Sequence, residues 1–113
     1  MRFRRMNSLT PQEVAAGLER GELQLVDVRE AGELAETRVA GATHIALASL
    51  PGRLGEFDRE RPVAFLCRSG SRSAIATRAA AKAGLDAANV RGGLIAWSRV
   101  GLPLSRGLWR GDA

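Results

Sequence analysis

Short runs of apolar residues alternate along the chain with longer stretches in which apolar and polar residues recur at helical spacing. The apolar runs predict strands, and the stretches between them predict helices. The predicted strands span residues 23–28, 42–46, 63–66 and 88–90. The predicted helices span residues 11–20, 30–36, 74–83 and 93–100. Residues 48–57 also have a helical pattern, but Pro51 and two glycines indicate a short or irregular helix there.

The ends of two helices are marked by residues that satisfy free backbone groups. Thr10 is the expected N-cap of the first helix, Pro11 occupies its first turn, and Glu13 completes a capping box. Gly21 ends this helix, and Gly84 ends the alanine-rich third helix. The boundaries of both helices are therefore predicted from local signals as well as from periodicity.

The order of the elements predicts the fold class. Strands that are separated by helices pair in parallel, so we expect an α/β fold: a three-layer sandwich with a central, mainly parallel sheet flanked by helices. We expect one domain over residues 1–113, with a core over residues 8–103. The tail from residue 104 has no clear pattern, although Leu108 and Trp109 are candidates for packing back onto the body. In such sheets ligands bind beyond the carboxyl ends of the strands.

The composition, with 45% hydrophobic and 26% charged residues, is ordinary for a soluble globular domain. No apolar run approaches the length that spans a bilayer, and residues 1–6 are basic but are not followed by the apolar stretch of a signal peptide. We therefore expect a cytoplasmic protein with no membrane partner. The single cysteine excludes an intramolecular disulfide. One cysteine and one histidine do not form a metal-ligand cluster, and we expect neither a metal site nor a cofactor.

The net charge of +5 raises the question of nucleic-acid binding. The arginines are scattered along the chain, however, and no aromatic residues interleave with a basic run. We therefore expect no nucleic-acid partner. The basic balance instead favours anionic small molecules or acidic partners.

The strongest candidate for chemistry is Cys67, the only cysteine. It ends a predicted strand, opens a polar loop over residues 68–73, and is followed at once by a predicted helix. The free thiol has a pKa of about 8.5, but the positive end of the helix and the guanidinium groups of Arg68 and Arg72 would favour its thiolate. Gly70 is free to adopt a positive φ, so the backbone amides of the loop would surround an anion or a sulfur atom.

Two interpretations of this cysteine compete. Free cysteines are often buried and inert, and a strand end is an ordinary place for one. An inert thiol does not need two arginines, a glycine and three serines directly after it, so the loop favours an activated nucleophile. These residues alone leave both sulfur chemistry and phosphate chemistry open.

Three segments, taken together and in this order, resemble the single-domain rhodaneses, which are sulfurtransferases. The first is LVDVRE at residues 25–30, and the second is the loop CRSGSRS at residues 67–73. The third is NVRGG at residues 89–93, followed by Trp97 and by GLP at residues 101–103. The resemblance covers almost the whole chain and implies a rhodanese-like fold.

The resemblance also implies a mechanism and a site. Cys67 would attack the outer sulfur of an anionic donor such as thiosulfate, release sulfite and keep the sulfur as a persulfide, which a thiophilic acceptor then removes. The acceptor is cyanide in an assay and a thiol, small or protein-borne, in the cell. The implied substrate-binding residues follow Cys67 directly: Arg68, Ser69, Gly70, Ser71, Arg72 and Ser73. A monomer or a weak dimer is expected.

Other polar residues near these motifs have simpler interpretations. The usual Gly-His-Ile of the family is replaced by Thr-Arg-Val at residues 37–39, and a usual proline by Ala46, which puts the local loop shape in question. His44 does not match the family histidine, so we interpret it as a strand-end residue. Asp27 and Arg29 are expected to bond neighbouring loops and nearby charges such as Glu33. Trp97 and the glycine pair before it are expected to serve packing and turns.

Two other functions remain open. Cysteine-dependent phosphatases and arsenate reductases on the same fold place five residues between cysteine and arginine, whereas four separate Cys67 from Arg72. The shorter loop forms a smaller cradle that suits a sulfur atom better than a tetrahedral phosphate. A persulfide carrier for a partner protein would use the same Cys67 chemistry, and a non-catalytic module would normally lack the cysteine.

Overall fold

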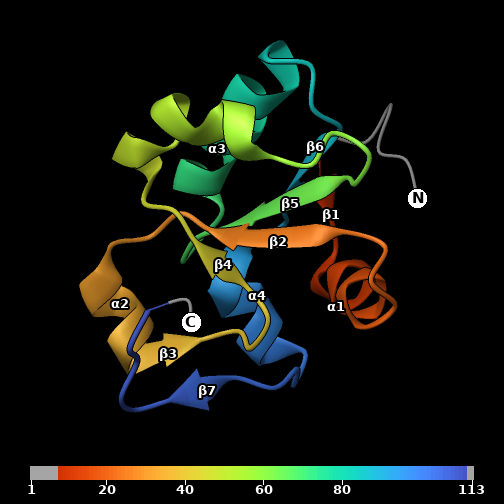
Figure 1. The fold of residues 1–113 in the computed structure, drawn as a ribbon. Helices are drawn as coiled ribbons and strands as arrows, with labels where there is room; N and C mark the ends of the chain where they lie inside the picture. Colours follow the sequence, from red (N-terminus) through yellow and green to blue (C-terminus); the bar gives the residue numbers. More distant parts are fainter. Residues whose placement is uncertain (1–7, 112–113) are drawn as a thin grey trace.

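The protein, seen in a computed structural model that describes residues 8–111, is built around a five-stranded sheet with the order β1-β6-β5-β2-β4 (Figure 1). Every neighbouring pair in this sheet is parallel. The strands are β1 (Ser8–Leu9), β2 (Gln24–Asp27), β4 (Thr43–His44), β5 (Val63–Leu66) and β6 (Ala87–Val90). The predicted parallel α/β sandwich is therefore confirmed.

Helices cover both faces of the sheet. On one face, α1 (Pro11–Glu19) and α4 (Gly93–Arg99) pack onto a core that includes Trp97. On the other face lie α3 (Ser71–Lys82) and two 3-10 segments, η1 (Leu47–Ser49) and η2 (Pro51–Glu56). The short helix α2 (Ala31–Glu36) lies beyond the end of β2 toward which its arrow points (Figure 1). No helix within residues 8–111 is long and apolar enough to cross a membrane.

The two-residue period of β5 determines which face receives the cysteine. Ala64 and Leu66 belong to the core beneath α1 and α4, whereas Val63 and Phe65 belong to the core beneath α3. Cys67 continues this alternation and falls on the α3 side. The sheet therefore presents the thiol to the first turn of α3.

The start of α3 differs from the sequence prediction. The predicted helix begins at residue 74, but the structure starts it at Ser71, with Gly70 as N-cap at a φ of 104°. A glycine in this left-handed conformation allows the chain to turn sharply into the helix. As a result Ser71, Arg72 and Ser73 stand in the first helical turn rather than in the loop.

The first helix follows its prediction closely. The hydroxyl of Thr10 accepts the Glu13 N–H at 3.2 Å, and the Thr10 N–H donates to the Glu13 carboxylate at 2.9 Å. The 48–57 segment is irregular as predicted, and forms η1 and η2. The strand predicted over residues 42–46 is reduced to the two residues of β4.

The tail forms structure that no sequence pattern predicts. β7 (Ser105–Arg106) pairs antiparallel with β3 (Thr37–Arg38) in a second, two-stranded sheet, visible at the bottom of Figure 1. The Arg38 guanidinium donates to the carbonyls of Gly107 and Leu108 at 2.9 and 3.0 Å. Trp109 does pack back, with its ring 5.2 Å from that of His44, but Leu108 is 75% exposed.

Candidate active site

The thiol of Cys67 is fully buried and lies against hydrogen-bond donors from the loop and from the first turn of α3. Its Sγ accepts the Gly70 N–H at 3.1 Å and the Ser73 N–H at 3.4 Å. The Ser73 hydroxyl is a third donor, at 3.2 Å. Three donors that converge on one sulfur stabilise a negative charge there. The predicted amide nest is thus present around this atom.

Two opposing effects act on the pKa of Cys67. Burial raises the pKa, since it disfavours the charged thiolate. The Ser73 hydroxyl and the N–H groups of Ser73, Gly70 and Ser69 lower it, and their combined effect is greater. The pKa of this thiol therefore lies below its ordinary value, and hydrogen bonds to the sulfur are the cause.

Asn89, on the neighbouring strand β6, holds the donors in place. The sequence analysis included it in the NVRGG segment but predicted no role for it. Its side-chain amide donates to the Gly70 carbonyl at 3.0 Å, which leaves its Oδ1 as acceptor for the Ser73 hydroxyl. One hydroxyl proton cannot serve both Asn89 and the sulfur of Cys67, so its direction depends on whether that sulfur is charged. A polar residue near the carboxyl end of the adjacent buried strand is the sequence signal that could have indicated this role.

The guanidinium of Arg72 forms an ion pair with a carboxylate. Its guanidinium makes a two-pronged contact with Glu33, at 2.8 and 2.9 Å. The pKa of Glu33 is lowered to about 2, mainly by the hydrogen bond from Arg72. Desolvation opposes this shift, and the hydrogen bond from the Glu30 N–H adds to it. The same pairing raises the pKa of Arg72. Its charge is thereby largely neutralised, and its expected role in holding a donor stays a prediction.

Three other predicted binding residues are exposed at the surface. Ser69 and Ser71 are exposed, with their hydroxyl oxygens 3.3 Å apart. Arg68 is exposed too, and within residues 8–111 its guanidinium has no ion-pair or hydrogen-bond partner. Of the two arginines in the loop motif, Arg68 is therefore the one whose charge is free to meet an anion.

Asp27 and Arg29 form a buried ion pair with each other, which the sequence did not predict, and Arg29 makes the expected hydrogen bonds to neighbouring backbone. The guanidinium of Arg29 contacts both carboxylate oxygens of Asp27, at 2.8 to 3.1 Å, and also donates to the Thr37 carbonyl at 2.7 Å. Its contact with Glu33 is to the backbone carbonyl, at 3.3 Å, because the carboxylate of Glu33 is turned to Arg72. Both carboxylate oxygens of Asp27 are engaged in this pair.

His44 and the glycine pair also have structural roles. The Nε2 atom of His44 lies 2.7 Å from the Arg29 carbonyl, which links β4 to the loop after β2. Gly93 sits so close to the active-site backbone that a Cβ there would be 2.5 Å from the carbonyl oxygens of both Cys67 and Arg68. Trp97 is buried and donates its indole N–H to the Pro103 carbonyl at 3.0 Å, which agrees with its predicted packing role.

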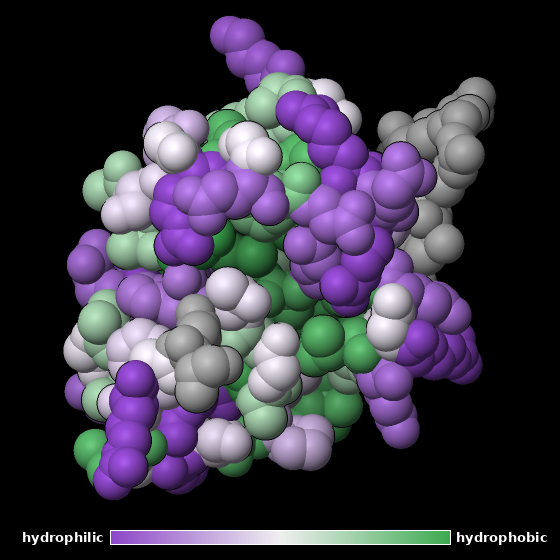
Figure 2. Space-filling model, viewed as in Figure 1, coloured by the Kyte–Doolittle hydropathy of each residue, from purple (hydrophilic) through white to green (hydrophobic). Residues whose placement is uncertain are grey.

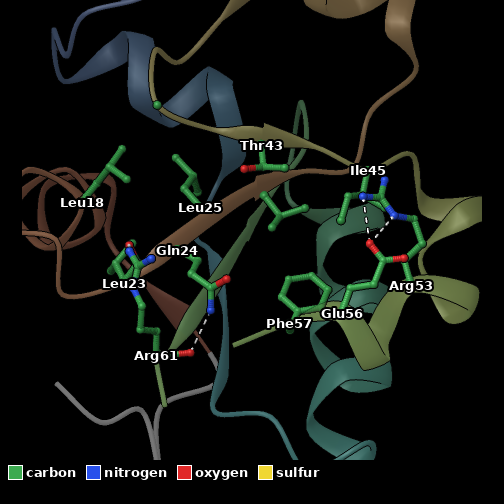
Figure 3. Close-up of a pocket in the computed structure, with 12 residues that line it drawn as sticks. Leu18, Leu23, Gln24, Leu25, Thr43, Ile45, Arg53, Glu56, Phe57 and Arg61 are labelled. Atoms are coloured by element: carbon green, nitrogen blue, oxygen red, sulfur yellow. Dashed lines mark hydrogen bonds and ion pairs between the residues drawn. The ribbon is translucent and has the colours of Figure 1, made fainter. Parts of the chain in front are cut away.

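A pocket of about 260 Å³ lies away from the sulfur, at the start of β2 (Figure 3). Its apolar lining includes Leu18, Leu25 and Phe57, and Figure 2 shows apolar surface between hydrophilic groups on this face. Its charged residues are engaged: Arg53 pairs with Glu56, and Arg61 donates to a backbone carbonyl. No group of three or more potential metal-ligating side chains occurs within residues 8–111. The chemistry available in the described part of the chain is therefore concentrated at Cys67.

The buried thiol lies in an amide nest beyond the carboxyl end of a parallel strand, which is the edge of the sheet where α/β proteins bind ligands. The rhodanese-like domain model matches residues 10–100, and the chain belongs to this family. It is 37% identical over 84 residues to a sulfurtransferase of Allochromatium vinosum, covering 74% of this chain and 78% of that protein. It is 29% identical to the thiosulfate sulfurtransferase GlpE of Glaesserella parasuis, covering 88% of this chain and 93% of that protein. A rhodanese-related protein of Thermoplasma volcanium superposes with a TM-score of 0.81 at 26% identity, covering 88% of this chain and 97% of that one.

Proposed function

We propose that this protein is a sulfurtransferase that carries sulfur as a persulfide on Cys67. The observation that carries the proposal is the set of three donors around a buried Sγ whose pKa is lowered. A thiolate held in this way is a nucleophile, and the same donors would stabilise the terminal sulfur of a persulfide. The names of the relatives, one of them a thiosulfate sulfurtransferase, support this chemistry.

The first half-reaction loads the cysteine. The thiolate of Cys67 attacks the outer sulfur of thiosulfate, the bond between the two sulfur atoms of the donor breaks, and sulfite leaves with its electron pair. Because the thiol has no exposed surface, the residues that cover it must move aside for a donor to reach it. This requirement favours a small donor over a bulky one.

The second half-reaction transfers the sulfur from Cys67 to an acceptor. A nucleophilic acceptor attacks the terminal sulfur of the persulfide, and the Cys67 thiolate is regenerated as the leaving group. The chain has no second cysteine to resolve the persulfide, so the acceptor comes from outside the chain. The acceptor is a thiol in the cell, and cyanide replaces it in an assay.

Phosphatase chemistry is the less favoured alternative. It needs an arginine that is free to hold the phosphate, and Arg72 is bonded to Glu33 through both of its terminal nitrogens. The four-residue spacing between Cys67 and Arg72 also leaves a small cradle.

Steady-state kinetics with thiosulfate and cyanide test the proposal. We expect parallel double-reciprocal lines, as in a two-step covalent mechanism, release of sulfite without cyanide in a single turnover, and no activity in Cys67→Ser. Intersecting lines with no sulfite burst would contradict the persulfide route. Hydrolysis of an aryl phosphate by the wild type, with no sulfur transfer, would establish the alternative.

A further inference from the structure

The side chain of Asn89 lies against the first turn of α3, on the same face of the sheet as Cys67. β6 pairs in parallel with β5, and α3 packs against both strands (Figure 1). Ala87 belongs to the core on the α3 side, whereas Ala88 and Val90 belong to the opposite core. The two-residue period of β6 therefore turns Asn89 toward α3. This side chain is half-buried, and it forms hydrogen bonds through both its oxygen and its nitrogen.

The Gly70 carbonyl fixes the direction in which the carboxamide of Asn89 points. This carbonyl accepts a hydrogen bond from the Nδ2 atom at 3.0 Å, and a carboxamide rotated by half a turn would place two acceptor oxygens against each other. The Oδ1 atom is thereby directed at the Ser73 hydroxyl, 2.5 Å away. The same hydroxyl oxygen is 3.2 Å from the sulfur of Cys67. Asn89 and Cys67 are therefore two acceptors that compete for one hydroxyl proton.

The charge of the sulfur decides this competition. A neutral thiol is a weak acceptor, and its own S–H can donate to the hydroxyl oxygen of Ser73. The hydroxyl proton then points to Oδ1 of Asn89, which is the stronger acceptor. A thiolate is a charged acceptor, and hydrogen bonds to charged acceptors are about twice as strong as neutral ones. Once the thiol has given its proton to a solvent base, the hydroxyl turns about its Cβ–Oγ bond and donates to the sulfur.

The rest of Ser73 is held in place, so only its hydroxyl proton needs to move. The residue is fully buried, and its backbone carbonyl accepts the hydroxyl of Thr77 at 2.8 Å. The charged and titratable side chains on the elements around the sulfur are kept in every variant described below, and they include Asp27, Arg29, Glu33, His44, Arg68, Arg72 and Arg91. Their effects on the sulfur are therefore common to all of these variants.

We propose that Asn89 is a positioning residue for the sulfur: it holds the Ser73 hydroxyl turned away from a neutral Cys67 and releases it to a charged one. The N–H groups of Gly70 and Ser73 serve the sulfur in either state, and the hydroxyl serves only the thiolate. In the proposed reaction, negative charge returns to the sulfur of Cys67 when the acceptor displaces it from the persulfide. The hydroxyl stabilises this leaving group as its charge develops, and this consequence alone rests on the proposed function.

A double-mutant cycle on the ionisation of Cys67 tests the proposal. Ser73→Ala removes the hydroxyl, and Asn89→Leu removes the competing acceptor while it fills a similar volume with apolar atoms. The measurement is the midpoint of the pH profile for alkylation by iodoacetamide, in the wild type, the two single variants and the double variant. Effects of Asn89 that act through the Gly70 carbonyl are common to both backgrounds and cancel in the cycle.

The sign of the coupling decides the outcome. With Asn89 intact, the hydroxyl must give up one hydrogen bond before it can stabilise the thiolate. We therefore expect Ser73→Ala to raise the midpoint by about 0.7 pH unit more when Asn89→Leu is also present, the equivalent of one neutral hydrogen bond. If Asn89 only braced the hydroxyl against the sulfur, the coupling would have the opposite sign. Zero coupling or the opposite sign would overturn the proposal.

Thr77→Val is the matched control for the cycle. It removes a hydrogen bond to Ser73, but the bond is to the backbone carbonyl and leaves the hydroxyl without a new partner. Its coupling with Ser73→Ala should stay within about 0.3 pH unit, the usual limit of additivity. A coupling of Thr77→Val as large as that of Asn89→Leu would assign the effect to general loosening of the turn and overturn the proposal.

NMR gives a direct readout that needs no substitution of Asn89. In the wild type, the resonance of the Asn89 side-chain carbonyl carbon should move at the midpoint of Cys67 ionisation, because its Oδ1 atom loses the hydroxyl proton. Most of this movement should be absent in Ser73→Ala, and equal movement in both proteins would overturn the proposal. Both measurements use the free thiol. Failure of every donor to load Cys67 would overturn the proposed function and leave the role of Asn89 to be decided by these two measurements.

Discussion

Replacing Glu33 with glutamine tests how the Arg72 ion pair contributes to the site. Glu33 has two partners: the guanidinium of Arg72, and the Glu30 N–H, which donates to it at 2.9 Å. Glutamine keeps the second contact, because glutamate and glutamine both complete a capping box. The variant therefore removes the charge of the pair and leaves the start of α2 intact.

The size of the effect follows from the pKa of Glu33, which falls from 4.5 to about 2. The difference of 2.5 units, at about 1.4 kcal/mol per unit, sets an upper limit of about 3.4 kcal/mol. The carboxylate is 31% exposed and its partner 35%, so solvent screening reduces this to about 1–2 kcal/mol. Because the pKa is depressed in the folded state, the stabilisation is complete above about pH 4.5 and is lost as the pH falls toward 2.

Urea denaturation followed by tryptophan fluorescence, at pH 7 and pH 3, measures this effect. We expect Glu33→Gln to lower the free energy of unfolding by about 1–2 kcal/mol at pH 7, and the difference from wild type to shrink at pH 3. Glu13→Gln is the matched control, since Glu13 completes the capping box of α1 but forms no ion pair with an arginine among residues 8–111. A difference for Glu33→Gln that is the same at both pH values, or no larger than that of Glu13→Gln, would refute the reasoning.

Two further substitutions test the geometry around the sulfur. Ser73→Ala removes the hydroxyl donor, so the pKa of Cys67 should rise; the midpoint of the pH profile for alkylation by iodoacetamide should move upward, and an unchanged midpoint would exclude this role. Gly93→Ala places a Cβ 2.5 Å from the carbonyls of Cys67 and Arg68, and should destabilise the fold by about 3 kcal/mol in thermal denaturation. Gly101→Ala, at a φ of 78° with no atom within 4 Å, carries only the backbone strain, and equal losses for both variants would show that the close approach is unimportant.

Much of the fold was predictable because its signals are local. The buried strand before Cys67 is a short apolar run, and the first helix begins with a capping box whose two contacts are both present. The position of Cys67 at the end of that strand also followed from the pattern. Local propensity and periodicity are sufficient where neighbouring residues determine the structure.

The features that the sequence did not predict depend on residues far apart in the chain. The β3–β7 sheet consists of two-residue strands, which are too short for a periodic pattern, and Arg38 supports it through carbonyls about 70 positions away. The pair between Glu33 and Arg72 joins residues 39 positions apart. The start of α3 at Ser71 depends on the left-handed conformation of Gly70. The residues next to Gly70 in the sequence do not by themselves determine that conformation. Of these features, the pair between Glu33 and Arg72 bears most directly on the site, because it engages one of the two arginines of the loop motif.

The central claim is that Cys67 carries sulfur, and intact-mass measurement of the purified protein tests it most directly. After incubation with thiosulfate and removal of excess donor, we expect the wild type to gain the mass of one sulfur atom and then lose it on addition of cyanide. Cys67→Ser should gain nothing. A wild-type protein that takes up no sulfur from thiosulfate or from a persulfide donor would contradict the account.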